Sequence, residues 1–397
     1  MLVAEKTASV PFAARMADLG TETAFEVLAR ARELEATGRQ IVHLEIGEPD
    51  FPTPVHIVEA GIQALRDGYT HYGPSAGLPE TRAAISRYVQ QTRGIPVTPD
   101  WVVVTPGAKP IMFFAVLALV DSGDEVIYPD PGFPIYESVI RLAGGRPVPI
   151  RLREDNHFRM DADELANAVS RRTKMIIINS PHNPTGSILT RGDLEMLGRL
   201  AVDHGVYILA DEIYSRILYD GKSESVLKVV PEAADHVILL DGLSKTYAMT
   251  GWRLGWGVMA PPIAAAVARL QTNSNSCTAS FSQRVVETAL FGSQDAVQNM
   301  RGEFRRRRDA IVDGLNAIKG VRCLVPDGAF YVFPNISDFG MPAREIARRL
   351  LEEAGVAVLA GTSFGPGGEG HLRFSYANSI DNIREGVARF ADWVSRL

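Results

Sequence analysis

A lysine and an arginine lie in a stretch of the sequence that is otherwise built to be buried. The stretch LLDGLSKTYAMTGWRLGW, residues 239–256, starts with an apolar, strand-like run that ends at Asp241 and Gly242, and Lys245 and Arg253 follow. A lysine beside a cationic cofactor site has a depressed pKa, which favours nucleophilic chemistry of its amine. The types and spacing of these residues therefore indicate a reactive amine close to a group that binds anions.

Other polar residues also follow apolar runs that are typical of strands. Asp211 ends the run VYILAD (206–211) and Tyr214 comes soon after it, while Asn183 lies in the loop SPHNPTG (180–186). Taken alone, each has an ordinary explanation, because Asp211 could cap a helix and SPHNPTG could be a plain proline-rich loop. Their shared position after predicted strands is what makes them candidates for a site.

Together these groups match the needs of one ligand, pyridoxal 5′-phosphate. The turn TPGAKP, residues 105–110, leads into a helix N-terminus whose backbone N–H groups and dipole suit a phosphate. The cofactor also needs a lysine for its aldehyde and an acidic partner for its ring nitrogen, because the protonated ring is the electron sink. Since open α/β sheets bind ligands at the carboxyl ends of their strands, we expect Lys245, Asp211 and Arg253 at one site.

The elements that must position these residues alternate between short apolar runs and longer amphipathic stretches. Near-continuous apolar strands separated by helices predict an α/β fold with a mostly parallel, buried central sheet. The expected strands are 101–105, 124–129, 174–179, 206–211, 236–241 and 253–260. The expected helices include 108–120 and 190–205, the second with Thr190 and Asp193 in capping-box spacing and Gly205 at its end.

The pattern changes near residue 295, which predicts a second, smaller domain of the α+β type. A long charged helix is expected over 300–320, and residues 15–39 are expected to be helical and to pack with the C-terminal part. Further strands are expected at 328–334, 356–361 and 371–377, and further helices near 342–355 and from 380 to the end. We therefore predict an N-terminal arm with part of the small domain (1–49), a large cofactor-binding domain (50–295) and a small C-terminal domain (296–397).

The composition argues against several classes of protein. The 397 residues, 46% hydrophobic and 22% charged, are ordinary for a globular protein, and the net charge of −6 gives no general attraction to nucleic acid or to anionic membranes. Two cysteines, Cys277 and Cys323, favour a reducing cytoplasm over a secreted disulfide scaffold, although one disulfide stays open. Residues 1–16 lack the continuous apolar core of a signal peptide, and the longest apolar run, 110–120, is too short to span a bilayer.

Two features that could indicate other ligands have plainer explanations. The RRRR run at 305–308 points around a helix and not along one face, so a solvated, salt-bridged surface is expected. The histidines show no metal-ligand spacing, and no metal site is expected.

The motifs of this chain resemble those of class I and II aminotransferases, enzymes of fold type I that use pyridoxal 5′-phosphate. The similarity is closest to the prokaryotic aspartate-aminotransferase-like branch. The matching pieces, in order, are GEPDF (47–51), HYGPSAGLPETR (71–82), TPGAK (105–109), DPGFPIY (130–136), NSPHNPTG (179–186), ADEIY (210–214), SKTYAMTGWRLGW (244–256), GAFYVF (328–333) and LRFSYA (372–377). Because they span nearly the whole chain, the resemblance implies the complete fold of this family.

The resemblance implies roles for the residues that match the family's cofactor-binding motifs. Lys245 is expected to bond to the cofactor aldehyde and then to move the proton between the substrate Cα and the cofactor, while Asp211 holds the ring nitrogen. Tyr214 and Asn183 would bond the phenolic oxygen, and Phe133 would stack on the ring. The expected phosphate contacts are Arg253, Ser244 and the backbone amides of Gly107, Ala108 and Lys109.

The resemblance also implies substrate contacts and a shared site. Arg373 is expected to hold the substrate α-carboxylate bidentately, with Asn183 and Gly47 close to the substrate. Lys109 resembles a lysine that attracts a distal carboxylate, which favours aspartate or glutamate; the apolar residues around it leave aromatic, alanine-type and specialised biosynthetic amino acids open. Tyr72 would reach the phosphate in a neighbouring subunit, which implies a homodimer with shared active sites.

Two positions depart from the pattern of the family. The loop is typically NNPTG, whereas this chain has HNPTG, and we expect His182 to be a loop residue without a catalytic role. Gly242 stands three residues before the lysine, where a serine is common, so Ser244 alone would supply a hydroxyl to the phosphate.

We expect a ping-pong aminotransferase reaction. An L-amino acid gives up its amino group and leaves as a 2-oxo acid, and a second 2-oxo acid, expected to be 2-oxoglutarate, accepts the group. A lyase or synthase of the same fold, such as a C–S lyase, would share these residues, and product analysis separates the two. A DNA-binding regulator is disfavoured by the short N-terminal region, and a nicotinamide dehydrogenase by the missing N-terminal fingerprint.

Overall fold

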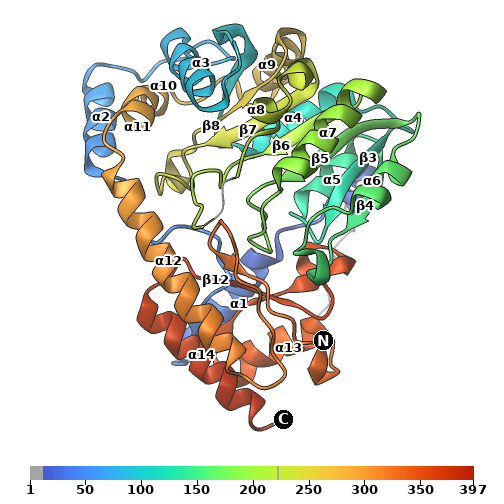
Figure 1. Ribbon diagram of the computed structural model, residues 1–397. Helices are drawn as coiled ribbons and strands as arrows, with labels where there is room; N and C mark the ends of the chain where they lie inside the picture. The colour runs from blue at the N-terminus through green and yellow to red at the C-terminus, as the bar shows by residue number, and fades with distance from the viewer. Residues whose placement is uncertain (1–11, 221–222) are drawn as a thin grey trace, which may run out of the picture.

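A seven-stranded sheet forms the centre of the upper part of the computed structural model, which describes residues 12–220 and 223–397 (Figure 1). Its strands are β2 (Val102–Thr105), β3 (Glu125–Asp130), β4 (Arg146–Arg151), β5 (Thr173–Asn179), β6 (Tyr207–Asp211), β7 (Val237–Gly242) and β8 (Gly255–Val258). They are ordered β2-β8-β7-β6-β5-β3-β4, and the pairings are parallel except those that β8 makes with β2 and β7. The expected mostly parallel α/β sheet is therefore confirmed.

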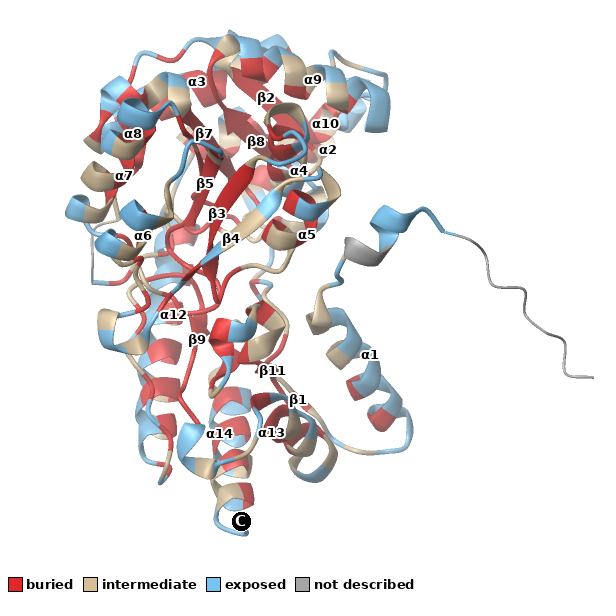
Figure 2. Cartoon of the chain, turned by 90° about the vertical axis from the view of Figure 1, so that its right-hand side faces the viewer, coloured by how far each residue is buried: buried red, intermediate tan, exposed pale blue. Residues whose placement is uncertain are grey.

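Helices bury both faces of this sheet. Successive residues of β5 alternate between two apolar clusters: Ile177 packs in the cluster that holds Ile111 of α4, and Ile176 packs in the one that holds Leu197 of α7. This alternation is what a strand buried on both sides requires, and Figure 2 shows the central strands as buried. The helices around the sheet are α2 (Val55–Arg66), α3 (Pro79–Arg93), α4 (Lys109–Leu119), α5 (Ile135–Leu142), α6 (Ala162–Ala168), α7 (Arg191–His204), α8 (Val226–Val229), α9 (Pro261–Asn275), α10 (Ser280–Gln283) and α11 (Val286–Phe291).

The lower part of the molecule is built from later elements together with one early helix (Figure 1). The long helix α12 (Asp295–Asn316) runs down from the sheet and packs along α14 (Ile380–Val394). The other elements are α1 (Thr23–Ala36), α13 (Ala343–Arg349), a parallel pair of β1 (Val42–His43) with β10 (Val356–Ala357), and an antiparallel sheet of β11 (Leu359–Ala360), β12 (Leu372–Ser375) and β9 (Tyr331–Val332). The division into 1–49, 50–295 and 296–397 stays a prediction.

The structure corrects the expected elements at several places. Residues 15–39 are not one helix: a 3-10 helix, η1 (Ala14–Asp18), is separated from α1, because Gly20 turns its N–H to the Oγ of Ser138 at 3.1 Å. The strand expected at 356–361 is divided into β10 and β11, and that expected at 328–334 is reduced to β9. The helix expected over 342–355 ends in a π-helical turn, Leu350–Ala354.

The capping signals around α7 are confirmed. Thr190 and Asp193 form a reciprocal capping box, and Gly205 ends the helix in the left-handed conformation at φ 65°. Because the end of this helix fixes where β6 starts, these caps also fix the position of Asp211 at the far end of that strand.

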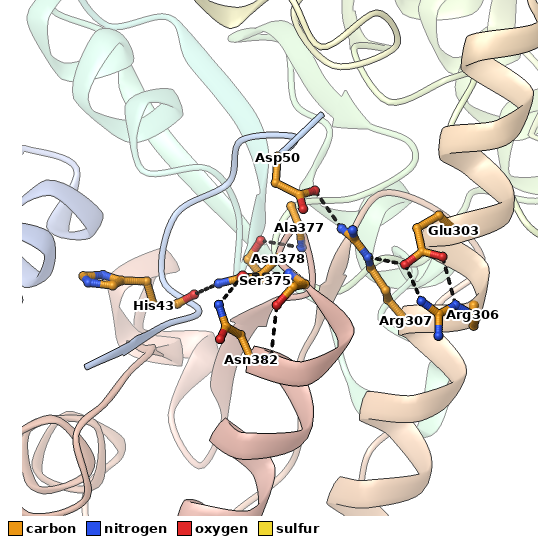
Figure 3. A network of polar contacts seen from close by, with 10 residues as sticks. His43, Asp50, Glu303, Arg306, Arg307, Ser375, Ala377, Asn378 and Asn382 are labelled. Atoms are coloured by element: carbon orange, nitrogen blue, oxygen red, sulfur yellow. Dashed lines mark hydrogen bonds and ion pairs between the residues drawn. The ribbon is translucent and has the colours of Figure 1, made fainter. Parts of the chain in front are cut away.

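The arginines at 305–308 are salt-bridged as expected, but two of them are buried and not solvated. Arg307 pairs with Asp50 at 2.7 Å and Arg308 pairs with Asp220 at 2.7 Å, and both are only 6% exposed. Figure 3 shows Arg307 of α12 reaching Asp50, which stands in the motif GEPDF. The ion pair of Arg307 therefore connects α12 to the segment that contains Gly47.

Two other expectations meet direct observations. Cys277 and Cys323 are both free, so the disulfide left open by the sequence is absent among the described residues. Within residues 12–220 and 223–397, no helix is long and apolar enough to cross a bilayer. The expectation about a signal peptide falls mostly on residues 1–11, which lie outside the described part of the chain.

Candidate active site

A cavity of about 370 Å³ lies at the carboxyl ends of the central parallel strands. Asn179 ends β5, Asp211 ends β6 and Lys245 follows β7, and all three line this cavity. The expected site residues that line it are Gly47, Ala108, Lys109, Phe133, Asn183, Asp211, Tyr214, Ser244, Lys245, Arg253 and Arg373. The polar residues that were expected at the ends of strands therefore line one cavity.

Lys245 has the properties of a reactive amine. Its Nζ donates a hydrogen bond of 2.5 Å to the carbonyl oxygen of Gly47 and lies 5.8 Å from the ring centroid of Phe330. Burial lowers the pKa of Lys245 to about 8, and the positive charges of Arg373 and Lys109 act in the same direction. At pH 7 about a tenth of this amine is therefore neutral and nucleophilic, whereas a lysine with the ordinary pKa of about 10.4 would be neutral in well under about a thousandth of the molecules.

Asp211 is a buried carboxylate that forms no ion pair with the residues that the structure describes. Its Oδ2 accepts a hydrogen bond of 3.0 Å from the hydroxyl of Tyr136, and its Oδ1 accepts one of 3.2 Å from the backbone N–H of Ile213. Burial raises the pKa of Asp211 to about 6. None of the ion pairs found within the described ranges includes Asp211, so its charge is free to meet a positive group in the cavity.

Hydrogen-bonding side chains surround Asp211. The hydroxyls of Tyr214 and Tyr331 lie 2.8 Å apart, and both residues are buried. Asn179 donates to the backbone oxygen of Asp211 at 2.9 Å and accepts the N–H of Asn183 at 2.8 Å. Asn179 thus holds the loop that carries Asn183 beside the end of β6.

The start of α4 offers the features of a phosphate site. The helix begins at Lys109, and its N-cap residue Ala108 makes no side-chain cap. Pro110 has no N–H and Ile111 donates to the carbonyl of Ala108 at 3.0 Å, so the N–H groups without a partner in the described part of the chain are those of Gly107, Ala108 and Lys109. Gly107, at φ 88°, lies so close to Arg253 that an added Cβ would stand 2.3 Å from its Nη2. Arg253 is held by the carbonyl of Thr250 at 2.7 Å. A guanidinium and unpaired N–H groups therefore converge at this end of the cavity.

The glycine at position 242 has a structural reason. A Cβ at Gly242 would lie 3.0 Å from the Cα of Gly255 and 3.0 Å from the backbone oxygen of Leu254, because β7 and β8 pack closely here. The serine that is common at this position would be crowded in this chain. Ser244, which is buried and lines the cavity, is the hydroxyl that remains available.

Arg373 is a buried cation without a carboxylate partner in the described part of the chain. One Nη donates to the Oδ1 of Asn183 at 3.2 Å and the other donates to the backbone oxygen of Glu45. Its guanidinium carbon lies 4.5 Å from the ring centroid of Tyr331 and 4.8 Å from that of Phe364, while its Nε has no hydrogen-bond partner. Such a fixed planar cation suits a carboxylate ligand.

Lys109 lies at the mouth of the cavity. Its Nζ stands 5.3 Å from the ring centroid of Phe133, and it forms an ion pair with Glu22. Glu22, Ala24 and Phe25 also line the cavity, so the start of α1 closes part of its wall.

Two of the expected site residues, Gly107 and Tyr72, do not line the cavity of one copy of the chain, although Gly107 lies beside Arg253. Tyr72 is 91% exposed, and its side chain does not line the cavity within one copy of the chain. His182 is buried in its loop, where its Nδ1 bonds the Oγ1 of Thr185 at 2.8 Å, and burial lowers its pKa to about 3. His182 does not line the cavity either, which agrees with the expectation of a loop residue.

Some residues of the site were missed from the sequence. Tyr136 and Tyr331 stand in the motifs DPGFPIY and GAFYVF, so the motifs themselves could have identified them. Asn179 directly follows the expected strand run and could have been included for the same reason as Asp211. Glu22 carries no motif or spacing signal, and its approach to Lys109 appears only in the folded chain.

The residues present fit pyridoxal 5′-phosphate. A buried carboxylate without a cation suits the protonated ring nitrogen, and open helix N–H groups beside Arg253 suit a phosphate. The amine of Lys245, with its lowered pKa, lines the same cavity and suits the aldehyde.

Comparisons with known proteins agree with this geometry. The profile of the family "Aminotransferase class I and II" matches residues 39–390. The chain is 39% identical to an aspartate aminotransferase of Geobacillus stearothermophilus, over 95% of this chain and 97% of that protein. The structure of a Thermus thermophilus aspartate aminotransferase with maleate has a TM-score of 0.92 and 38% identity, covering 96% of this chain and 99% of that one. An alanine aminotransferase from Pyrococcus furiosus also has a TM-score of 0.92, with 32% identity, over 98% of this chain and 100% of that one.

The family profile covers most of the chain, and the relatives are 32–39% identical over nearly their whole length, so together they identify the family of this protein. The fold is that of the fold-type I enzymes, and the cofactor is pyridoxal 5′-phosphate. This chain belongs to the class I and II aminotransferases, and it is an aminotransferase that depends on pyridoxal 5′-phosphate.

Proposed function

We propose that this aminotransferase takes aspartate or glutamate as amino donor and a 2-oxo acid, such as 2-oxoglutarate, as acceptor. The observation that carries the proposal is that two cations, Arg373 and Lys109, line the same cavity as the amine of Lys245. A substrate with two carboxylates can pair one with each cation. The Geobacillus relative is named for aspartate, and the Thermus relative has been solved with maleate, a dicarboxylate.

The bond-breaking step would depend on proton transfer by Lys245. The chemistry that pyridoxal 5′-phosphate supplies when bound is the withdrawal of electrons from the substrate Cα. Asp211 would hold a proton on the ring nitrogen by its nearby negative charge. Lys245, as a neutral amine, would accept the proton from the substrate Cα. Tyr214 and Asn183 would supply hydrogen bonds to the phenolic oxygen.

The substrate would be oriented by residues around Arg373. Its guanidinium is held between the rings of Tyr331 and Phe364 and bonded to Asn183, so it is fixed before a carboxylate arrives. The absence of a side chain at Gly47 lets the hydroxyl of Tyr331 pack against the backbone there, because an added Cβ would lie 2.1 Å from that hydroxyl. Fixing the carboxylate in this way would place the Cα–H bond near the amine of Lys245.

We also propose a homodimer in which Tyr72 completes the site of the other copy. Tyr72 is 91% exposed, so its side chain is available for contact with a second molecule. A phenol from the partner would add a hydrogen bond to the phosphate. Mixing an inactive Lys245→Ala chain with a Tyr72→Phe chain, in which cofactor binding should be weakened, tests this, because each heterodimer would hold one intact site and regain tight cofactor binding there.

The donor is tested by following the visible spectrum of the purified holoenzyme during titration with single L-amino acids. We expect aspartate and glutamate to convert the cofactor to its amine form without an added oxo acid. Lys109→Ala should weaken this response to acidic amino acids about tenfold, since one charge contact with the distal carboxylate is lost. Lys228→Ala, which removes an exposed lysine paired with Glu224, is the matched control. Equal responses of Lys109→Ala and wild type to aspartate would refute the role of Lys109, and no response of the wild type to either acid would refute the acidic donor.

The same experiment separates an aminotransferase from a lyase of this fold. A lyase would release ammonia from a single amino acid without any oxo-acid acceptor. Stoichiometric formation of one 2-oxo acid per cofactor, with no ammonia, is the expected result.

A further inference from the structure

Lys109 already has a carboxylate partner within the protein. Glu22 and Lys109 form an ion pair although they are 87 residues apart in the chain, and both line the cavity. The side chains are 25% and 43% exposed, respectively, so the pair is partly shielded from water. The cation proposed to meet a distal carboxylate is therefore neutralised before any substrate binds.

The position of Glu22 explains why its side chain is free to do this. Glu22 is the N-cap residue of α1, a position where serine, threonine, aspartate or asparagine usually caps the helix. Its side chain makes no cap to its own helix and reaches Lys109, the first residue of α4. The carboxylate of Glu22 therefore interacts with a residue of the cavity and does not cap α1.

The carboxylate of Glu22 also acts on the interior of the site. Burial is the largest effect on the pKa of Arg373 and lowers it, while the negative charge of Glu22 is among the charges that oppose this effect. The same pattern holds for the pKa of Lys245, where burial dominates and Glu22 acts in the opposite direction. Glu22 therefore faces the space that a substrate would enter.

We propose that Glu22 is an internal competitor for Lys109 and sets the selectivity between dicarboxylic and monocarboxylic substrates. This inference rests on the proposed function, in which Lys109 meets the distal carboxylate. A dicarboxylate has to displace the carboxylate of Glu22 before it pairs with Lys109. A substrate with an uncharged side chain leaves the ion pair between Glu22 and Lys109 intact. Its side chain then contacts a part of the cavity wall that has no net charge and includes Phe25 and Phe133.

This arrangement lets one cavity serve two classes of substrate. In a ping-pong reaction both amino acids and both oxo acids use the same cavity in turn, so a fixed unpaired lysine would penalise any apolar side chain placed against it. A lysine with an exchangeable internal partner avoids a bare charge in one half-reaction and offers a cation in the other. Removing the Glu22 charge should therefore shift the enzyme towards dicarboxylates.

The test measures binding of unreactive acids to the holoenzyme by isothermal titration calorimetry. Maleate serves as the dicarboxylate and 3-phenylpropionate as the monocarboxylate. Glu22→Gln should tighten maleate binding by about threefold to tenfold, the range for loss of one partly exposed ionic competitor. It should weaken binding of 3-phenylpropionate by about twofold or more, because the apolar ring then meets an unpaired lysine. Glu26→Gln is the matched control, because Glu26 lies on the same helix and bonds Thr21 outside the cavity.

A double-mutant cycle with Lys109→Ala separates the two proposals. In the Lys109→Ala background, Glu22→Gln should no longer tighten maleate binding, because there is no cation left to release. If Lys109→Ala weakens maleate binding but Glu22→Gln changes maleate and 3-phenylpropionate equally, the competitor role of Glu22 is overturned and the acidic-donor proposal stands. If Lys109→Ala leaves maleate binding unchanged, the acidic-donor proposal itself fails.

Discussion

The amine of Lys245 donates a hydrogen bond of 2.5 Å to the backbone oxygen of Gly47, which lies 198 residues earlier in the chain. Lys245 follows the end of β7, whereas Gly47 follows β1 in the lower part of the molecule. The segment with Gly47 is itself fastened to α12 by the 2.7 Å ion pair between Asp50 and Arg307 (Figure 3). The reactive amine is thus positioned from both parts of the fold.

Replacing Lys245 by alanine should remove the proton transfer and retain binding. We expect turnover to fall by a factor of about 10² to 10⁴ or more, because the general base is lost. Binding of maleate should change little, since Arg373 and Lys109 remain. Single-turnover absorbance measurements with aspartate, together with calorimetric titration of maleate, provide the test, and full turnover by this variant would refute the role of Lys245.

The lowered pKa of Lys245 predicts a pH dependence for uptake of the cofactor by the apoprotein. The neutral amine attacks the aldehyde, and with a pKa of about 8 its neutral fraction rises about tenfold per pH unit below pH 8 and levels off above it. An unburied lysine would level off only near pH 10.4. Stopped-flow absorbance from pH 6 to 10 should therefore show a plateau from about pH 9, and a rate that still rises steeply at pH 10 would contradict the burial argument.

The uncompensated charge of Asp211 should cost stability in the apoprotein. Its pKa is about 6 in the folded chain, against about 3.9 when unfolded, so folding stability falls as pH rises from about 4 to 6. At pH 7, Asp211→Asn should therefore stabilise the apoprotein by about 1 to 2 kcal/mol and weaken cofactor binding. Thermal unfolding at pH 4 and pH 7, with and without cofactor, measures both effects. The gain should vanish near pH 4, and an equal gain at both pH values would point to packing and not to charge.

Much of the fold could be predicted because its strands are encoded locally. The β5 run KMIIIN has the apolar, β-branched composition of a strand buried on both sides, and the observed strand is Thr173–Asn179. The edge strand β4, RPVPIR, was missed, because Pro147 and Pro149 remove ladder donors and argue against a strand. Such prolines are tolerated at an edge, where one side of the strand has no partner.

Some residues of the site could likewise be predicted from the sequence, whereas other contacts could not. Lys245 and Asp211 were located by their places after apolar runs, because parallel strands bring their carboxyl ends together. The contact of Glu22 with Lys109 could not be predicted, since it depends on how α1 lies against α4 and no spacing in the sequence encodes that. The hydrogen bond from Tyr136 to Asp211 has the same character, as it joins residues 75 positions apart.

A buried cluster behind the site should be a major determinant of stability. Arg93 of α3 donates to Glu212 at 2.8 Å and to Asp241 at 3.2 Å, and these carboxylates lie at the ends of β6 and β7. Arg93→Met should destabilise the protein by about 3 to 5 kcal/mol, because it leaves two buried carboxylates without a cation.

The control for this change lies on the same helix. Arg87→Met breaks the exposed pair with Glu287 and the contact of the guanidinium with the ring of Phe291, so it should cost about 1 kcal/mol. Urea unfolding of the holoenzyme compares the two variants, and similar losses for both would mean that the buried cluster contributes no more than a surface pair.

The close approach of Gly47 and Tyr331 predicts that Tyr331→Phe lowers the activity of the wild type but raises that of the Gly47→Ala variant. A Cβ added at Gly47 would lie 2.1 Å from the hydroxyl of Tyr331 and 3.0 Å from its Cζ. Gly47→Ala should therefore push Tyr331 away from Tyr214, whose hydroxyl lies 2.8 Å from that of Tyr331, and away from Arg373. We expect kcat/KM for aspartate to fall about tenfold to a hundredfold, the scale of a misplacement of about 1 Å in a site.

Removing the hydroxyl of Tyr331 should harm the wild type but help the Gly47→Ala variant. In the wild type, Tyr331→Phe leaves buried Tyr214 without its partner and should lower kcat/KM several-fold, as expected for one lost hydrogen bond of about 1 kcal/mol. In the Gly47→Ala background the same change removes the atom at 2.1 Å and leaves the nearest contact at 3.0 Å, so part of the lost activity should return. Steady-state kinetics of the four proteins measure this coupling. If the two substitutions proved additive, the loss in Gly47→Ala would arise from the backbone of residue 47 and not from its contact with Tyr331.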